Sequence, residues 1–103
     1  MNDNFITLNA NDFEKAIANS TTIILDVRTA DEYRSGHIPN AINIDMSRPD
    51  FEKRLSKHKT LAVYCKNGVR SKMTAIILAN RGFRVVYLDG GITEWEKAGK
   101  TTE

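Results

Sequence analysis

The chain contains a single cysteine, Cys65, at a position where a thiol can act as a nucleophile. Cys65 ends the apolar run 61–64 and opens the loop 66–71, and a helical pattern follows over residues 73–80. A side chain between the carboxyl end of a strand and the first turn of a helix faces backbone N–H groups and the positive end of the helix dipole. Both favour an anion, so we expect Cys65 to be held as a reactive thiolate in a shallow pocket that is open to solvent.

Basic residues and a glycine surround this cysteine in the sequence. We expect Arg70 to hold anionic donors, whereas Lys66 and Lys72 serve either to steer substrates or to keep the surface solvated. Gly68 is expected to provide a turn, or a close approach of the backbone to a bound anion. A buried structural thiol is the alternative role for Cys65, since free cysteine packs like a small apolar side chain. Its place before a basic loop favours the reactive role.

The composition is that of one globular domain, and we expect residues 1–103 to form it. The net charge of +2 gives no reason to expect nucleic acid as a partner. A single cysteine cannot form a disulfide within the chain, and the amino terminus lacks a signal-peptide pattern. The longest strictly apolar run, residues 75–79, is too short to span a membrane. We therefore expect no membrane partner and a cytoplasmic location.

Short apolar runs alternate with helical patterns, which predicts an α/β fold. The run 22–27 is too continuously apolar for a strand with one wet face, and it belongs in a parallel sheet covered by helices on both sides. We expect a three-layer sandwich with a mostly parallel sheet of four to five strands. The predicted strands are residues 5–8, 22–27, 41–44, 61–65 and 85–88. The predicted helices follow cap or turn residues at 9–12, 29–32, 47–50, 66–71 and 89–91.

In the helix after the cysteine loop, the apolar surface is widened by Ala75, Leu78 and Ala79. We therefore expect it to be largely covered. The residues expected on its main face are Val69, Met73, Ile76, Ile77 and Asn80.

Parallel strands bring their carboxyl ends to one edge of a sheet, where ligands bind. The segments 26–28 and 89–91 fall at this edge with Cys65. Asp26 and Arg28 are expected to form a structural pair that shapes the loop.

Two further polar residues lie close by in the sequence. The side chain of Glu32 is expected to take part in the cap of the helix that follows Thr29, with a contact to Arg28. His37 is a tempting general base, but it begins a turn into a strand, and it has no partner at a spacing that suits a metal site.

These motifs, in this order, resemble the rhodanese family of sulfurtransferases. The matching segments are Asp26-Val27-Arg28, Glu32-Tyr33, Gly36-His37-Ile38-Pro39-Asn40-Ala41, Cys65-x-x-Gly68-x-Arg70-Ser71, and Gly90-Gly91 with Trp95. The resemblance extends from about residue 22 to residue 99. Asn40 stands where the family often has glycine, and asparagine tolerates the left-handed backbone of such a turn.

The resemblance implies that a sulfane sulfur moves from thiosulfate or a persulfide donor to cyanide or a thiol, without a metal or organic cofactor. Cys65 matches the cysteine that carries the sulfur, and Asp26 and Arg28 match supporting residues. The chain has no second cysteine, so the acceptor comes from outside, as a small molecule or as a protein that donates or accepts sulfur. The residues that match the substrate-binding loop are Lys66, Asn67, Gly68, Val69, Arg70 and Ser71.

Two other functions are alternatives to sulfur transfer. One is a rhodanese-fold module that binds a partner or delivers sulfur within a larger assembly. The other is a phosphatase or arsenate reductase of the related fold, in which five residues separate the cysteine from the arginine. Four residues separate Cys65 from Arg70. A shorter loop makes a tighter cup, which suits one sulfur atom better than a tetrahedral oxyanion.

Overall fold

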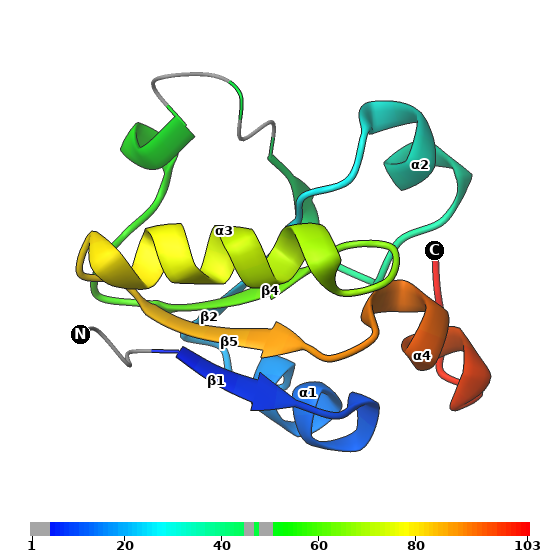
Figure 1. Ribbon diagram of the computed structural model, residues 1–103. Helices are drawn as coiled ribbons and strands as arrows, with labels where there is room; N and C mark the ends of the chain where they lie inside the picture. Colours follow the sequence, from blue (N-terminus) through cyan, green and yellow to red (C-terminus); the bar gives the residue numbers. More distant parts are fainter. Residues whose placement is uncertain (1–4, 45–46, 48–50) are drawn as a thin grey trace.

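The computed structural model describes residues 5–44, 47 and 51–103, apart from the side chains at positions 52 and 54. Within these residues, five strands form one parallel sheet in the order β1-β5-β4-β2-β3 (Figure 1). The strands are β1 (Phe5–Leu8), β2 (Thr22–Asp26), β3 (Ile42–Asn43), β4 (Thr60–Tyr64) and β5 (Arg84–Leu88). The predicted α/β class and parallel sheet are confirmed.

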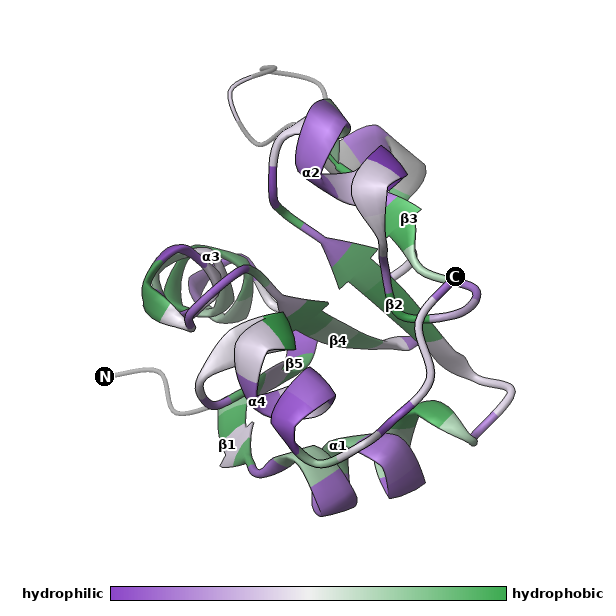
Figure 2. Cartoon of the chain, turned by 90° about the vertical axis from the view of Figure 1, so that its right-hand side faces the viewer, coloured by the Kyte–Doolittle hydropathy of each residue, from purple (hydrophilic) through white to green (hydrophobic). Residues whose placement is uncertain are grey.

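Helices cover both faces of this sheet, which makes the predicted three layers (Figures 1 and 2). On one face, α3 and η1 pack on β-strand residues such as Val63 and Val85. On the other face, α1 and α4 contribute Phe13 and Trp95 to a second apolar cluster. The helical segments are α1 (Ala10–Ile17), α2 (Ala30–Ser35), the 3-10 turn η1 (Phe51–Arg54), α3 (Val69–Asn80) and α4 (Gly91–Lys97). None of the helices in the described residues is long and apolar enough to cross a bilayer.

Local signals in the sequence set several of these boundaries. The side chain of Asn9 accepts a hydrogen bond from the N–H of Asp12 and so begins α1. Thr29 and Glu32 form the predicted capping box of α2, and Gly36 ends that helix.

Two further predictions from local sequence signals concern the turn at Asn40 and the helix start at 47–50. Asn40 has a φ of +71°, the left-handed backbone expected for it. The helix predicted to open at 47–50 falls mostly outside the described residues, and the structure after it is the single turn η1. Phe51 is buried, and Leu55 packs partly buried against the same cluster.

The outer side of α3 corrects one expectation. Val69, Met73 and Ile77 are 68%, 60% and 39% exposed, so this side is not covered by the described residues. The side of α3 that packs on the sheet is formed mostly by small residues, which allow the helix to lie close to the strands. Apart from Leu78, which is buried, the large apolar residues Val69, Met73 and Ile77 therefore face outward. The buried residues of α3 are Ser71, Thr74, Ala75, Leu78 and Ala79.

A buried ion pair lies at the end of β2, between its last residue, Asp26, and Arg28 in the segment that follows. Asp26 is fully buried, and Arg28 contacts it through Nη2 at 2.6 Å and Nε at 3.0 Å. Burial on its own lowers the pKa of Arg28, but the hydrogen bonds and the charge of Asp26 outweigh burial and raise that pKa. The two residues therefore form the structural pair predicted from the sequence.

Tyr64 connects this pair to the strand that carries the cysteine. Its hydroxyl donates to Asp26 Oδ2 at 2.7 Å and accepts from the N–H of Ile38 at 3.0 Å. Burial, followed by the hydrogen bond to Asp26, raises the pKa of Tyr64 well above that of a free phenol. The hydroxyl therefore keeps its proton and remains a donor to the carboxylate.

We expect Tyr64→Phe to lower the free energy of unfolding by about 1–3 kcal/mol, because the N–H of Ile38 loses a buried acceptor and Asp26 loses a donor. Tyr87→Phe is the matched control. The Tyr87 ring is also buried, but its hydroxyl makes no hydrogen bond within the described residues. Urea denaturation measures both variants. Equal losses would contradict the role given to the Tyr64 hydroxyl.

Candidate active site

The cysteine lies at the carboxyl end of β4, the middle strand of the sheet. β2 and β5 flank β4 in parallel, so the residues that follow these three strands meet at one edge. Figure 2 looks onto this edge. The sequence predicted that the segments 26–28 and 89–91 would meet Cys65 here, and the sheet order confirms it.

The sulfur of Cys65 is surrounded by hydrogen-bonding groups from the start of α3. It accepts from the N–H of Gly68 at 3.1 Å and from the N–H of Ser71 at 3.2 Å. The Ser71 hydroxyl lies 3.3 Å from the sulfur and bonds Gly68 O at the same distance. Two N–H donors and the positive end of α3 stabilise negative charge on the sulfur. The expected cluster of amides around Cys65 is confirmed.

The burial of the sulfur differs from the expectation. Cys65 is 0% exposed and belongs to the same apolar cluster as Val63 and Ala75, whereas the sequence suggested a sulfur open to solvent. The cause is the loop itself, which turns two amides inward and so covers the atom that they bind. The side chains of Lys66, Asn67 and Val69 are exposed, so the loop is held mainly through its backbone.

The first turn of α4 binds the outer side of this loop. The N–H of Ile92 donates to Cys65 O at 2.8 Å, while the N–H and the hydroxyl of Thr93 donate to Lys66 O at 3.1 and 2.9 Å. Gly91 comes so close that a Cβ built on it would lie 2.4 Å from Cys65 O. With these carbonyls drawn towards α4, the N–H groups that follow are free to face the sulfur. Sequence reasoning missed Thr93, and its only signal was the helix start after Gly90-Gly91.

Arg70 lies at the mouth of the site with its side chain half exposed. Its Nη2 bonds Glu32 Oε1 at 3.2 Å, so the expected contact between Glu32 and Arg28 is wrong. Arg28 is instead occupied by the buried carboxylate of Asp26.

Glu32 thereby joins the cap of α2 to the cysteine loop. The backbone hydrogen bond from Thr29 and, after it, the Arg70 guanidinium lower the pKa of Glu32. A lowered pKa means that these contacts stabilise the fold at neutral pH and are lost as the pH falls through the folded-state pKa.

Comparison with known proteins fits this geometry. The family described as "Rhodanese-like domain" matches residues 9–98. The chain belongs to the rhodanese-like domain family. The resemblance inferred from the sequence motifs is therefore confirmed.

Several members of the family are similar to this chain over most of their length. Thiosulfate sulfurtransferase GlpE of Coxiella burnetii is 35% identical over 83 residues, which cover 79% of this chain and 78% of that protein. Putative sulfurtransferase YtwF of Bacillus subtilis is 34% identical over 84 residues, covering 81% and 82%. A rhodanese-related protein from Thermoplasma volcanium superposes with a TM-score of 0.87 at 33% identity, covering 95% of this chain and 97% of that one.

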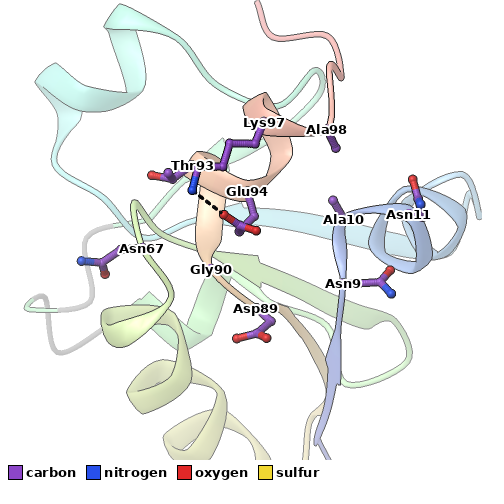
Figure 3. A pocket seen from close by; sticks show the side chains of 10 residues that line it. All are labelled: Asn9, Ala10, Asn11, Asn67, Asp89, Gly90, Thr93, Glu94, Lys97 and Ala98. Carbon is purple, nitrogen blue, oxygen red and sulfur yellow. Dashed lines mark ion pairs between the residues drawn. The ribbon is translucent and has the colours of Figure 1, made fainter.

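Two hollows border the cysteine loop of this rhodanese-like domain. The larger, of about 670 Å³, lies between the loop, the start of α1 and the outer side of α4 (Figure 3). An ion pair of 3.3 Å joins Lys97 and Glu94 on its wall. The smaller, of about 390 Å³, is lined by both Arg28 and Arg70 and, among the residues that the structure describes, by no acidic side chain. Arg28 is paired with Asp26 and Arg70 with Glu32, so an anion bound there competes with these carboxylates.

His37 takes no part in this site. Its ring stacks on Tyr33 at 3.9 Å, and its Nδ1 lies 2.9 Å from Tyr33 O. Its backbone pairs with that of Glu103. Among the described residues, no three His, Cys, Asp or Glu side chains gather as metal ligands would. That the chain needs no metal or organic cofactor stays a prediction.

We expect Gly91→Ala to be more damaging than Gly99→Ala, although both glycines have a left-handed backbone. A methyl group at position 91 meets the backbone of Cys65 and Lys66, whereas at position 99 it meets nothing within 4 Å. The left-handed backbone costs an alanine about 1 kcal/mol at either position, and the clash adds about 1–3 kcal/mol at Gly91. Urea denaturation gives both values. If the two variants are equally stable, the close approach of α4 to the loop is not a constraint.

Proposed function

We propose that this protein is a sulfurtransferase in which Cys65 carries a sulfane sulfur from thiosulfate or a persulfide to cyanide or a thiol. The observation that supports it most is the sulfur at the start of α3, bound by the N–H groups of Gly68 and Ser71. Relatives about one-third identical to this chain are named as sulfurtransferases, which agrees with the proposal.

In the first step, the Cys65 thiolate attacks the outer sulfur of the donor. A bond forms between the two sulfurs, and the bond inside the donor breaks with its electron pair. The rest of the donor leaves: sulfite in the case of thiosulfate, and a thiolate in the case of a persulfide. The new outer sulfur on Cys65 carries the negative charge, and loop N–H groups stabilise it.

In the second step, an acceptor attacks this outer sulfur and removes it. The bond to Cys65 breaks and returns its electron pair to the cysteine, which becomes a thiolate again. With the sulfur attached, cyanide becomes thiocyanate and a thiol becomes a persulfide. Because the chain has no second cysteine, the acceptor is a separate molecule. Since the sulfur is covered, a donor or an acceptor reaches it when part of the loop is displaced.

The length of the cysteine loop supports sulfur transfer over phosphate or arsenate chemistry. Four residues separate Cys65 from Arg70, and such a short loop suits one bound sulfur atom better than a tetrahedral oxyanion. A module that only binds a partner is the remaining alternative, and it predicts a protein that thiosulfate leaves unmodified. The single domain spanning residues 1–103 is part of this proposal, and the cytoplasmic location stays a prediction.

Incubation with thiosulfate is expected to raise the intact mass of the protein by one sulfur atom. Cyanide then removes the added mass and yields thiocyanate. Cys65→Ser is expected to abolish both signals without loss of the fold, because the hydroxyl is not a comparable nucleophile. Mass spectrometry, a thiocyanate assay and circular dichroism measure these outcomes. A folded wild-type protein that stays unmodified favours the binding module.

For Arg70→Ala we expect kcat/KM for thiosulfate to fall by about tenfold, as for the loss of one hydrogen bond to a charged group. With an uncharged organic trisulfide as the donor, kcat/KM is expected to stay within about twofold of the wild type, since this donor offers no charge to Arg70. Arg34→Ala is the control, because Arg34 is an exposed arginine on α2 that pairs with Asp31. A similar decrease with both donors would show that Arg70 does not recognise the anion.

A further inference from the structure

Charge is distributed very unevenly along this chain. Residues 53–88 contain nine Lys and Arg and no Asp or Glu, whereas the other residues contain six basic and thirteen acidic side chains. The net charge of +2 hides this separation. The basic segment includes β4, the cysteine loop, α3 and β5. The outer surface of α3, which lies within this segment, therefore attracts acidic molecules.

An apolar stripe runs along the outer side of α3 in the middle of this basic segment. Val69, Met73 and Ile77 form it, and we call these three residues the α3 stripe. They are four residues apart, so they lie above one another on the helix. At 3.6 residues per turn, Lys72 falls on one edge of the stripe and Arg70 on the other. Figure 2 shows hydrophobic colour on the side of α3 that faces away from the sheet.

The stripe begins at the cysteine loop. Val69 is the first residue of α3 and follows Gly68, whose N–H bonds the sulfur of Cys65. At a rise of 1.5 Å per residue, the stripe extends about 12 Å from Val69 to Ile77. A molecule that covers it is therefore next to Cys65.

We propose that the α3 stripe docks a protein whose reactive cysteine accepts sulfur from Cys65, and whose apolar patch is surrounded by Asp and Glu. The proposal rests on the proposed function. The partner's thiolate attacks the outer sulfur of the Cys65 persulfide, the bond to Cys65 breaks, and the sulfur leaves as a persulfide on the partner. An apolar centre with charges at its rim is the usual construction of a transient protein interface.

Two other occupants fit this surface less well. A nucleic acid would bind the cations through its phosphates but would leave the apolar stripe uncovered. A second copy of the chain would bring an equally basic surface against this one, so the two would repel each other. An acidic protein satisfies both the stripe and the cations.

The test uses two amphipathic helical peptides as acceptors. Each ends in a cysteine and has the same leucine face, and the face is flanked by glutamates in one peptide and by lysines in the other. Protein loaded with thiosulfate is mixed with each peptide, and loss of the added sulfur is followed by mass spectrometry. At low salt we expect the acidic peptide to react at least about tenfold faster, with a difference that shrinks in high salt. Equal rates at low salt would overturn the proposal.

Variants locate the effect on α3. Met73→Gln combined with Ile77→Gln is expected to slow transfer to the acidic peptide by about fivefold or more, while turnover with cyanide stays within about twofold. Ile6→Gln combined with Ile42→Gln is the matched control, because these residues are 60% and 41% exposed on strands β1 and β3. The control is expected to behave as the wild type. If both double variants react alike, the α3 stripe is not the docking surface.

A binding measurement separates this proposal from the proposed function. In an NMR titration with the acidic peptide carrying serine in place of cysteine, we expect shifts along α3 even if thiosulfate never modifies the protein. Shifts confined to other elements would overturn the docking surface. A single-stranded RNA of about ten nucleotides is titrated in parallel. RNA binding that is weakened by Lys72→Glu but unchanged by the Met73 and Ile77 substitutions would also overturn it, in favour of a nucleic-acid site.

Discussion

The hydrogen bonds from the first turn of α4 to the carbonyls of Cys65 and Lys66 control the site more than any other contact. They fix the outer side of the loop, and the N–H groups of Gly68 and Ser71 are then directed at the sulfur. This arrangement requires α4 to begin almost in contact with the loop backbone, and only a glycine at position 91 has room there. The nucleophile thus depends on a helix that begins 26 residues later in the sequence.

A second constraint keeps the neighbouring strand ends in place. A buried carboxylate such as that of Asp26 is costly without partners, and Arg28 and the Tyr64 hydroxyl together satisfy it. Because Tyr64 immediately precedes the cysteine, this network also positions the end of β4. The pairing of Glu32 with Arg70 adds a weaker, exposed connection between α2 and the loop. Buried polar contacts thus position the cysteine from one side of the sheet edge and α4 from the other.

Much of the fold follows from local patterns in the sequence, because continuous apolar runs and cap residues act over a few positions. The parallel sheet, the capping box of α2 and the cysteine at a strand end were all predictable in this way. The outward α3 stripe was not, since helical periodicity groups side chains on a face but does not say which face packs on the sheet. The buried sulfur of Cys65 depends on α4, and the partner of Glu32 depends on Asp26 having already occupied Arg28. Such competition between distant residues leaves no local signal.

Burial of the sulfur and separation of charge have a common consequence for sulfur transfer. If Cys65 carries a persulfide as proposed, the closed loop would shield it from water and from stray thiols, and its outer sulfur would react when the loop is displaced. Cyanide is small and needs little displacement, whereas a protein thiol needs more. A partner seated on the α3 stripe contacts Val69, which follows Gly68 of the cysteine loop. Recognition of the partner and exposure of the sulfur would then be one event, and the choice of acceptor would be made by the surface of α3 rather than by the chemistry of the thiol.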